Sequence, residues 1–323
     1  MILVFFGVLL SCSDAKDQLT LNQAAQAFSK FNSYQDLKFN DVVKIDTKTP
    51  GTIIHHDSLL FLITTQTNDN WVDIVSLEQK KIIRNHLKYG AGPEEALGII
   101  SAGITGDSLW LYDITKLRIH KYSVNDLIKK EKPTSKIYKV SELFYSMKML
   151  NDSVAIASGT RSSNDKLQFF NIYAQTLEHF GGTYRASNEI PPGTVKDALT
   201  SYVNVRPYQG EANIATIGRY TDAIEFFDSR AQQVNYAIHG QDKFHPSYSI
   251  GQTQGMFYMY SGALRAEGDR WSFGKTLHVF DWNGNPDIAY QLDQFIYGYD
   301  IDEENRKMYA YSEEQNMLVY ADL

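Results

Sequence analysis

Gly106-Asp107-Ser108-Leu109-Trp110-Leu111 places a tight turn directly before a run of apolar residues. Residues 56–61 and 151–156 repeat this pattern with an Asp-Ser pair at the same place, and looser copies begin at residues 210, 254 and 305. The six copies are spaced about 45 to 58 residues apart. A repeat of this length, built from short apolar strands, is typical of β-propeller blades.

Each copy belongs to a unit of four strands. One strand precedes the turn, as at residues 297–301, and two more follow the copy, as at residues 71–77 and 81–88. Four antiparallel strands in each of six units are the pattern of propeller blades. We therefore predict an all-β fold over residues 37–323, a six-bladed β-propeller of four-stranded antiparallel blades.

The sixth unit is one strand short, because the chain stops at Leu323 directly after the third strand of that unit. Residues 39–46 form an alternating strand that no unit uses. We predict that this N-terminal strand completes the last blade and closes the ring. Closure of this kind also removes a free sheet edge, which would otherwise invite aggregation.

Composition agrees with an all-β fold and narrows the class of partner. Of the 323 residues, 13% are aromatic, including 21 Tyr and 17 Phe. Aromatic side chains suit the half-buried, pleated surface of a sheet. The formal net charge is −7, whereas nucleic acids attract basic surfaces. The sequence therefore excludes nucleic acid as the expected partner.

Cys12 is the only cysteine, which rules out a disulfide framework and a Cys-based zinc site. It follows an apolar run over residues 2–10, much shorter than the roughly 20 residues of a membrane-spanning helix. Leu9-Leu10-Ser11-Cys12 resembles the bacterial lipobox, so we interpret residues 1–12 as a signal peptide that ends at a lipidated Cys12. No Lys or Arg precedes Ile2, and a chance apolar start is the alternative.

Residues 13–36 separate this signal from the predicted propeller. Residues 13–18 are polar, and apolar side chains recur with helical spacing at Leu21, Ala24 and Phe28. We expect a tether or spacer that contains a short helix.

Several motifs resemble a known family. Tyr89-Gly90-Ala91-Gly92-Pro93-Glu94-Glu95 follows the first unit, and residues 277–285 and 299–310 share a strand-and-turn pattern. Over residues 37–323 the chain resembles the TolB-like six-bladed β-propeller lipoproteins of Gram-negative bacteria. The resemblance implies a lipid-anchored protein of the cell envelope, on the periplasmic side of the outer membrane or at the cell surface. Because the shared motifs are structural, they imply no activity.

Long connections indicate which face of the predicted ring binds a partner. The links from each outer strand to the next inner strand emerge on the same face as those between second and third strands. On our strand assignment this face receives the two longest irregular segments, residues 181–198 and 261–275. Long loops in a compact domain are more often functional than accidental. We expect the binding face over units three to five.

Most of the arginines fall on this expected face. Guanidinium groups beside aromatic rings could hold a carboxylate, a phosphate or an acidic sugar through paired hydrogen bonds. The alternative is that they are solvated and paired with Glu189, Glu211, Glu225 and Glu267. The predicted ligand-binding residues are Arg161, Arg185, Arg206, Tyr208, Arg219, Tyr220, Arg265, Arg270 and Trp271.

Two groups with metal-binding side chains have structural interpretations. His55-His56 could form a metal pair, but His56 aligns with Gly106 in the repeat, at a turn position. Residues 300–305 are rich in oxygen ligands suited to calcium, yet they coincide with a hairpin turn and lack a glycine at the bend. We expect neither a metal nor a cofactor.

The glycine-rich stretch of residues 90–95 is not a phosphate-binding loop, because no Gly-Lys-Ser/Thr follows it. Its glycines are expected to allow a tight crossing between two blades. Glu94 or Glu95 either lines the mouth of the channel or accepts hydrogen bonds from amides of the loop.

No Gly-x-Ser-x-Gly elbow and no His-Glu-x-x-His motif occurs in the sequence. We predict a lipid-anchored, extracytoplasmic binding or interaction module whose partner is a glycan, a peptide, another anionic ligand or an envelope protein. One alternative is a hydrolase or lyase whose carboxylates and histidines, such as His245, line the channel. The other is a structural subunit of an envelope complex, with a large exposed apolar patch.

Cys12→Ala should release the protein from membranes, because the acyl chains on this residue are its only expected membrane attachment. The measurement is cell fractionation followed by immunoblotting, with Ser13→Ala as the matched control. If the Cys12→Ala variant stays in the membrane fraction, the lipid anchor is wrong.

Overall fold

The computed structural model describes sixteen stretches of the chain. They are residues 26–28, 30–45, 50–64, 67, 69–159, 165–183, 201–205, 214–218, 223–228, 233–239, 246–252, 256–261, 265–267, 270–272, 275–312 and 314–323. Within these stretches the structure is almost entirely β, and no helix among them has the length and apolar character needed to cross a bilayer.

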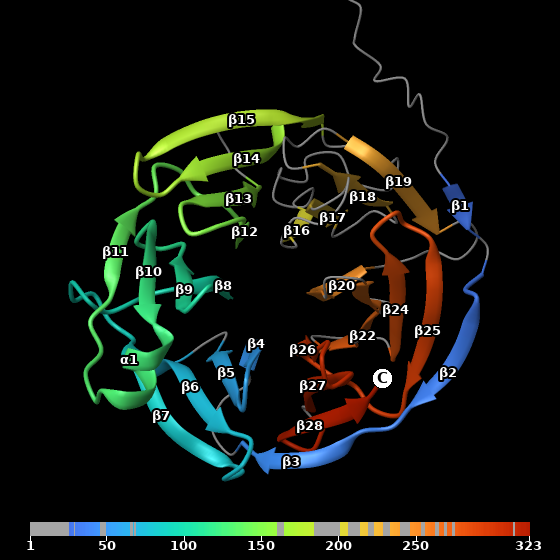
Figure 1. Cartoon of the computed structure of the whole chain (residues 1–323), viewed down its shortest axis with the longest axis horizontal. Coiled ribbons are helices and arrows are strands. Elements are labelled where there is room, and N and C mark those ends of the chain that lie inside the picture. The colour runs from blue at the N-terminus through green and yellow to red at the C-terminus, as the bar shows by residue number, and fades with distance from the viewer. Residues whose placement is uncertain are drawn as a thin grey trace, which may run out of the picture.

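The strands of these stretches pair into six sheets of four or five strands, the blades, which radiate around one central axis (Figure 1), and one further sheet has two strands. Blade 1 contains β4 (Pro50–His56), β5 (Leu59–Thr64), β6 (Asn70–Ser76) and β7 (Lys81–Lys88). Blade 2 contains β8 (Ile99–Thr105), β9 (Ser108–Asp113), β10 (Arg118–Ser123) and β11 (Lys136–Lys139), with the short helix α1 (Val124–Lys129) after β10. Blade 3 contains β12 (Ser146–Met149), β13 (Val154–Ser158), β14 (Asp165–Asn171) and β15 (Thr176–Thr183).

The other three blades follow the same order from the axis outward. Blade 4 contains β16 (Ser201–Val205), β17 (Ile214–Gly218), β18 (Ala223–Phe227) and β19 (Gln233–His239). Blade 5 contains β20 (Pro246–Gln252), β21 (Met256–Ser261), β24 (Thr276–Asp281) and β25 (Pro286–Leu292), with the hairpin β22 (Arg265–Glu267) and β23 (Arg270–Ser272) between β21 and β24. Blade 6 contains β26 (Tyr299–Asp302), β27 (Lys307–Ser312), β28 (Met317–Asp322) and β3 (Asn40–Lys44). An all-β propeller of four-stranded antiparallel blades is thereby confirmed.

The N-terminal segment supplies the outer strand of the last blade. Strand β3 pairs antiparallel with β28, with Val43 opposite Leu318, so the predicted partner of the sixth unit is confirmed. Before β3, two further strands run parallel to outer strands of other blades: β2 (Ser33–Leu37) along β25 and β1 (Gln26–Phe28) along β19. Phe28, expected in a helix, therefore lies in a strand, and residues 26–28 and 33–36 of the expected spacer pair with the blades (Figure 1). Leu21 and Ala24 lie outside the described residues.

Aromatic packing holds this N-terminal segment against blade 5. The Phe31 ring stacks on the His278 ring with centroids 4.6 Å apart and meets Phe280 edge-on. Leu37 is buried in the core that blades 5 and 6 share. Burial of such side chains explains why the chain adds strands to existing sheets here instead of forming a solvated helix.

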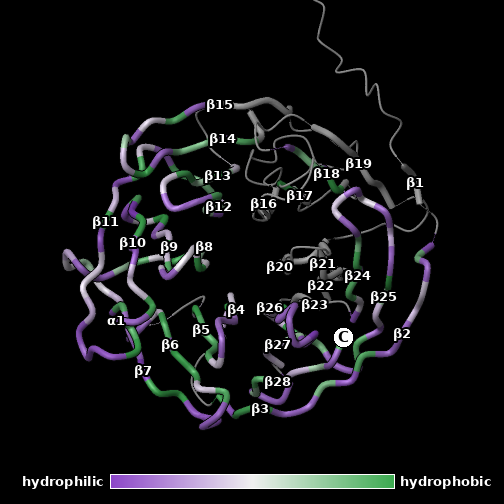
Figure 2. Tube along the Cα trace, in the orientation of Figure 1, coloured by the Kyte–Doolittle hydropathy of each residue, from purple (hydrophilic) through white to green (hydrophobic). Residues whose placement is uncertain are grey.

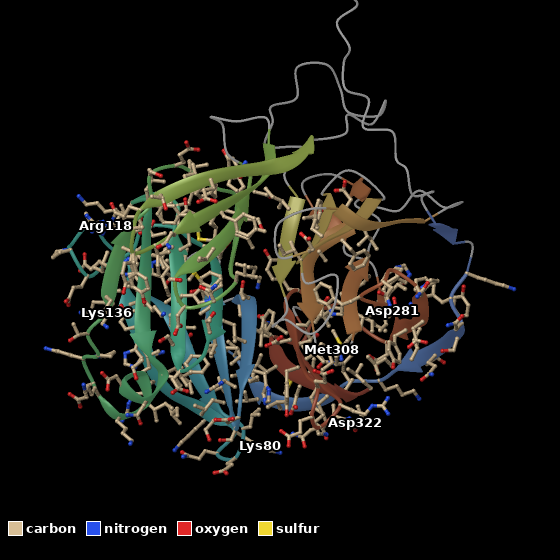
Figure 3. All side chains as sticks on the ribbon, turned by 45° about the horizontal axis from the view of Figure 1, so that its top comes forward. Lys80, Arg118, Lys136, Asp281, Met308 and Asp322 are labelled. Atoms are coloured by element: carbon tan, nitrogen blue, oxygen red, sulfur yellow. The ribbon has the colours of Figure 1, made fainter. Side chains whose placement is uncertain are left out.

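Both faces of a blade are buried against its neighbours. On β9, Leu109 and Leu111 pack into the core between blades 1 and 2, whereas Trp110 and Tyr112 pack into the core between blades 2 and 3. Strands that are buried on both faces read as continuous apolar runs, as Figure 2 shows for β5. Polar side chains lie on the outer rim of the ring, where Lys136 of β11 points outward (Figure 3).

Hairpin turns repeat one local device, which is a side-chain oxygen at the strand end that accepts hydrogen bonds from turn amides. Asp113 Oδ1 accepts from the N–H groups of Thr115 and Lys116. Asn171 and Asp281 hold the corresponding turns of blades 3 and 5 in the same way.

The hairpin that joins the first two strands corrects the predicted position of His56. His56 pairs with Leu59 at the end of β4, so it lies in the strand and not in the turn. The turn residue equivalent to Gly106 is Asp57, because both have a φ of 53°. The sequence repeat that aligned His56 with Gly106 is therefore wrong by one residue at this turn.

Truncation tests the role of the N-terminal strands. A chain that begins at residue 26 should melt like the full chain, whereas one that begins at residue 46 should lose its cooperative transition. Loss of the buried Leu37 and Ile45 side chains alone costs about 2–5 kcal/mol each. A chain that begins at residue 38 keeps β3 and separates ring closure from the pairing of β1 and β2. Calorimetry measures the three transitions, and an unchanged transition in the shortest chain would contradict closure by β3.

His120 on β10 makes stability depend on pH. Its side chain is fully buried, and neither ring nitrogen has a hydrogen-bond partner among the described residues. Burial lowers the pKa of His120 to about 4, while Asp113 acts in the opposite direction and Lys116 and Arg118 add to the lowering. The unfolded chain therefore takes up a proton near pH 6.5, where the folded chain does not.

Acidification from pH 7 to pH 5 should cost about 2 kcal/mol of stability through His120, because only the unfolded state gains this proton. The loss begins as the pH falls through the unfolded pKa and is complete below the folded one. His120→Leu should remove this part of the pH dependence in urea unfolding at both pH values. His56→Leu is the matched control, and an equal acid sensitivity in the His120→Leu variant would contradict the assignment.

Candidate functional site at the ring axis

Three inner strands bring charged side chains to the centre of the ring. His55 lies on β4 of blade 1, Lys148 on β12 of blade 3 and Asp300 on β26 of blade 6. Strands β12 and β26 face each other across the axis, and β4 is next to β26 (Figure 1). Residues from distant parts of the sequence thus meet at one place.

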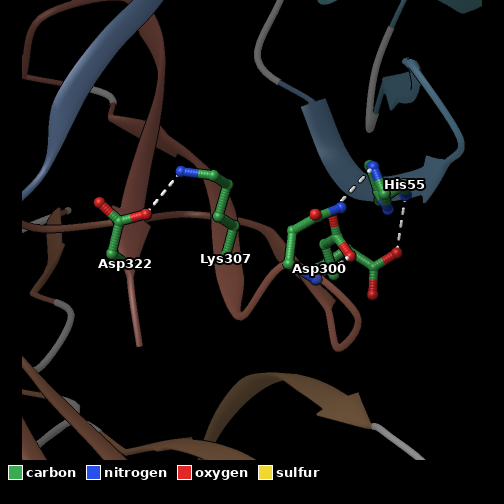
Figure 4. Close-up of polar contacts among 6 residues, drawn as sticks. His55, Asp300, Lys307 and Asp322 are labelled. Carbon is green, nitrogen blue, oxygen red and sulfur yellow. Dashed lines mark hydrogen bonds and ion pairs between the residues drawn. The ribbon is translucent and has the colours of Figure 1, made fainter.

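Asp300 is fixed by the backbone of the neighbouring blade. The His55 N–H donates a hydrogen bond of 2.7 Å to Asp300 Oδ2 (Figure 4). Burial raises the pKa of the Asp300 carboxyl group, while the amides of His55 and Ile301 and the charge of Lys148 act in the opposite direction. Desolvation therefore outweighs the groups that favour the carboxylate at this position.

The His55 ring is held between an aromatic ring and a second carboxylate. It stacks on Tyr309 with centroids 5.1 Å apart and an interplanar angle of 16°. His55 Nε2 lies 3.6 Å from Asp302 Oδ2, which is too long for a hydrogen bond (Figure 4).

Asp302 itself serves the hairpin turn of blade 6. Its Oδ1 accepts from the Asn305 N–H at 3.0 Å, and its Oδ2 accepts from Asn305 Nδ2 at 2.9 Å. The acidic stretch of residues 300–305 was expected to belong to a hairpin turn, and for the Asp302 carboxylate this interpretation is confirmed. Among the described stretches, no group of three His, Cys, Asp or Glu side chains has the geometry of a metal site.

Lys148 is the unusual member of the axial group. Its neighbours Met147 and Met149 pack into the core between blades 2 and 3, so Lys148 leaves the strand on the other side. It keeps partial solvent contact, yet burial lowers the pKa of its ammonium group, and Asp300 opposes that effect. Within the described part of the chain, Lys148 has no hydrogen bond and no ion pair within 4 Å.

The crossing between blades 1 and 2 has a structural role. Glu95 Oε2 accepts from the Gly92 N–H at 2.7 Å, and Lys116 Nζ donates to the carbonyls of Gly92 and Glu95. A Cβ on Gly90 or Gly92 would collide with the Glu95 carboxyl group in its present place, and Gly90 also has a φ of 156°, which favours glycine. The tight crossing is confirmed, and Glu95 accepts a loop amide as one of the two interpretations expected.

The structure leaves the predicted arginine site untested. Arg265, Arg270 and Trp271 belong to the hairpin β22–β23, where Arg270 pairs with Glu267 through the backbone. Glu225, expected as an arginine partner, is buried on β18 and accepts from Thr216 Oγ1 at 3.2 Å. Eight of the residues to which the sequence analysis gave a role lie outside the described stretches: Cys12, Arg161, Arg185, Arg206, Tyr208, Arg219, Tyr220 and His245.

Sequence reasoning missed Lys148 and the axial role of Asp300. The available signal for Lys148 was a single charge between two methionines in the sequence Ser146-Met147-Lys148-Met149, which is otherwise the inner strand of a blade. Asp300 was noticed only as a member of an acidic turn, although it lies in β26 and not in the turn.

The fold is that of a β-propeller, and its inner strands carry ionisable side chains at the ring axis. The chain belongs to the TolB-like 6-blade propeller-like family, whose model matches residues 27–304. No curated protein sequence matches the chain.

Two solved structures illustrate the shared fold. A predicted exported protein from Bacteroides fragilis is 10% identical, has a TM-score of 0.58, and aligns over 90% of this chain and 99% of its own. The β-propeller domain of Myceliophthora thermophila Cps50 (Swd1) is 10% identical with a TM-score of 0.51, over 88% of this chain and 99% of its own. At these identities the likeness shows the fold alone.

Proposed function

We propose that this protein is an extracytoplasmic binding module that holds an anionic group of its ligand at the ring axis, on Lys148. The observation that carries the proposal is the desolvated ammonium group of Lys148, which has no hydrogen-bond partner in the described part of the chain. A charge in such a place is costly unless it is paired. Ionisable groups with perturbed pKa values are enriched at functional sites.

Asp300 is expected to influence which anions bind at Lys148 and how strongly they bind. Its charge lies close enough to Lys148 to affect the pKa of the ammonium group. Because burial raises the pKa of Asp300, its carboxyl group can take up a proton and donate a hydrogen bond when an anion arrives. A carboxylate or phosphate of the ligand would then compete with Asp300 for Lys148.

Catalysis by His55 and the two aspartates is less well supported than binding. Asp300 Oδ2 accepts a backbone amide, both oxygens of Asp302 hold Asn305, and His55 Nε2 is beyond hydrogen-bond reach of Asp302. A general acid or base must reach the proton that it transfers. These groups are engaged in holding the strands and the turn in place.

The proposal includes the predicted arginines and the cellular location. Arg161 lies between β13 and β14 in the sequence and Arg219 between β17 and β18, and we expect both connections on the binding face. We place the protein in the cell envelope, anchored through Cys12, as a single closed ring of six blades. The six sheets, the family and the exported neighbour support this placement.

Lys148→Met should abolish anion binding and stabilise the fold. A hydrogen bond to a charged group contributes about 1.5–3 kcal/mol, so affinity for the ligand should fall at least tenfold. The net lowering of the Lys148 pKa means that its charged form opposes folding, so removal of the charge should raise the melting temperature. Titration calorimetry with glucuronate, inorganic phosphate and a tripeptide, together with thermal unfolding, measures both effects.

Lys136→Met is the matched control, because Lys136 is exposed on the outer strand β11. It should change neither binding nor stability. Arg161→Ala with Arg219→Ala separately tests the contribution of the arginines. Equal affinity of Lys148→Met and the unaltered protein for every anion that binds would overturn the axial site.

A further inference from the structure

We propose a second binding site, for a neutral sugar, in a pocket between the outer parts of blades 1 and 2. The pocket has a volume of about 310 Å³. Strand β7, the crossing before β8 and the segment after α1 form its walls, on the outer rim of the ring (Figure 1). Ligand pockets span roughly 300–1,000 Å³, so this one suits a mono- or disaccharide. It is separate from the axis, where the charged site lies.

The walls of the pocket are held in place by buried hydrogen bonds. Asn85 Nδ2 donates to Asp73 Oδ1 at 2.5 Å, and Asp73 is buried in blade 1. Glu95 is fixed by the Gly92 amide, as described above. A pocket whose polar side chains are already oriented loses less conformational entropy when a ligand binds.

His86 lines the pocket and contacts helix α1, and its ring has one nitrogen that donates and one that accepts. The pKa of its imidazole is lowered, mainly by burial, so the ring is neutral at pH 7. His86 Nε2 lies 2.7 Å from the Leu127 carbonyl, which only accepts hydrogen bonds, so Nε2 carries the proton. The other ring nitrogen, Nδ1, is then an acceptor.

Charged groups of both signs line the pocket. Three carboxylates, Glu94, Glu95 and Glu131, lie with two ammonium groups, Lys88 and Lys132. A ligand with a net charge of either sign would therefore meet a repelling group as well as an attracting one. This mixture favours a neutral ligand, and the excess of one carboxylate disfavours an anion.

The pocket lining contains both donors and acceptors, which suits a polyhydroxylated molecule. The hydroxyl groups of Tyr122 and Ser135 and the amides of Asn70 and Asn85 can each donate and accept. Each hydroxyl of a sugar also donates one hydrogen bond and accepts others, so neighbouring hydroxyls can satisfy such a mixed set. A ligand that only donates or only accepts would leave part of this set unpaired.

An exposed aromatic residue, Tyr89, follows the pocket residue Lys88 in the chain. Tyr89 bridges to Ala96, which follows the pocket residue Glu95, and is 43% exposed. The rings of Tyr89 and Trp71 contact each other, with centroids 6.1 Å apart. The apolar C–H face of a sugar ring can pack on such an aromatic surface while its hydroxyls bond to polar groups.

Glu131→Ala with Lys132→Ala tests the pocket without disturbing the core, because both side chains are exposed and the net charge stays the same. Saturation-transfer NMR and titration calorimetry use glucose, galactose, mannose, N-acetylglucosamine and lactose as probes, with glucuronate and glucosamine as charged counterparts. We expect at least one neutral sugar to bind saturably and to lose at least tenfold in affinity in the double variant.

Glu78→Ala with Lys139→Ala is the matched control, since it removes the same two charge types from exposed side chains that do not line the pocket. It should leave sugar binding unchanged. Lys148→Met should also retain sugar binding, which separates this site from the axial one. No saturable binding of any neutral sugar, unchanged affinity in the pocket variant, or a preference for the charged probes would each overturn the proposal.

Discussion

The antiparallel pairing of β3 with β28 is the constraint on which the rest of this structure depends. It brings an N-terminal strand, β3, beside the last strand of the chain within one blade, so that blade 6 is built from two distant parts of the sequence. Blade 6 can then pack against blade 1 on one side and against blade 5 on the other. In this arrangement the sheets shield one another from water, and apolar side chains can point to both faces of a strand.

The same closure determines what faces the axis. Inner strands must lie close together around the centre, and a side chain that leaves them there meets groups from other blades. His55 reaches Asp300 through its backbone amide, and Lys148 affects Asp300 from the opposite side of the ring. Each of these charged groups loses solvation on folding, which a purely structural strand would avoid by carrying an apolar residue. Retention of the charges is the physical basis for placing a ligand there.

The N-terminal strands show how tertiary structure overrides a local pattern. Apolar residues with helical spacing predicted a helix that includes Phe28, but β1 and β2 pair with the exposed edges of blades 4 and 5. An unpaired edge offers a row of backbone donors and acceptors to any extended segment within reach. Phe31 and Leu37 add buried apolar area, which a short isolated helix in water lacks.

The amino-acid sequence by itself determined the repeat, the four strands of each blade, the missing strand of the last blade and the tight crossing at the glycines, because turns, alternation and glycine requirements are local properties. The tertiary structure alone decided that Lys148 and Asp300 share the axis and that Asn85, Glu94 and Glu131 line one pocket. Those groups come from separate blades or separate connections, and nothing local in the sequence records their distance. Their proximity follows only from the closure of the ring and the angle between neighbouring blades.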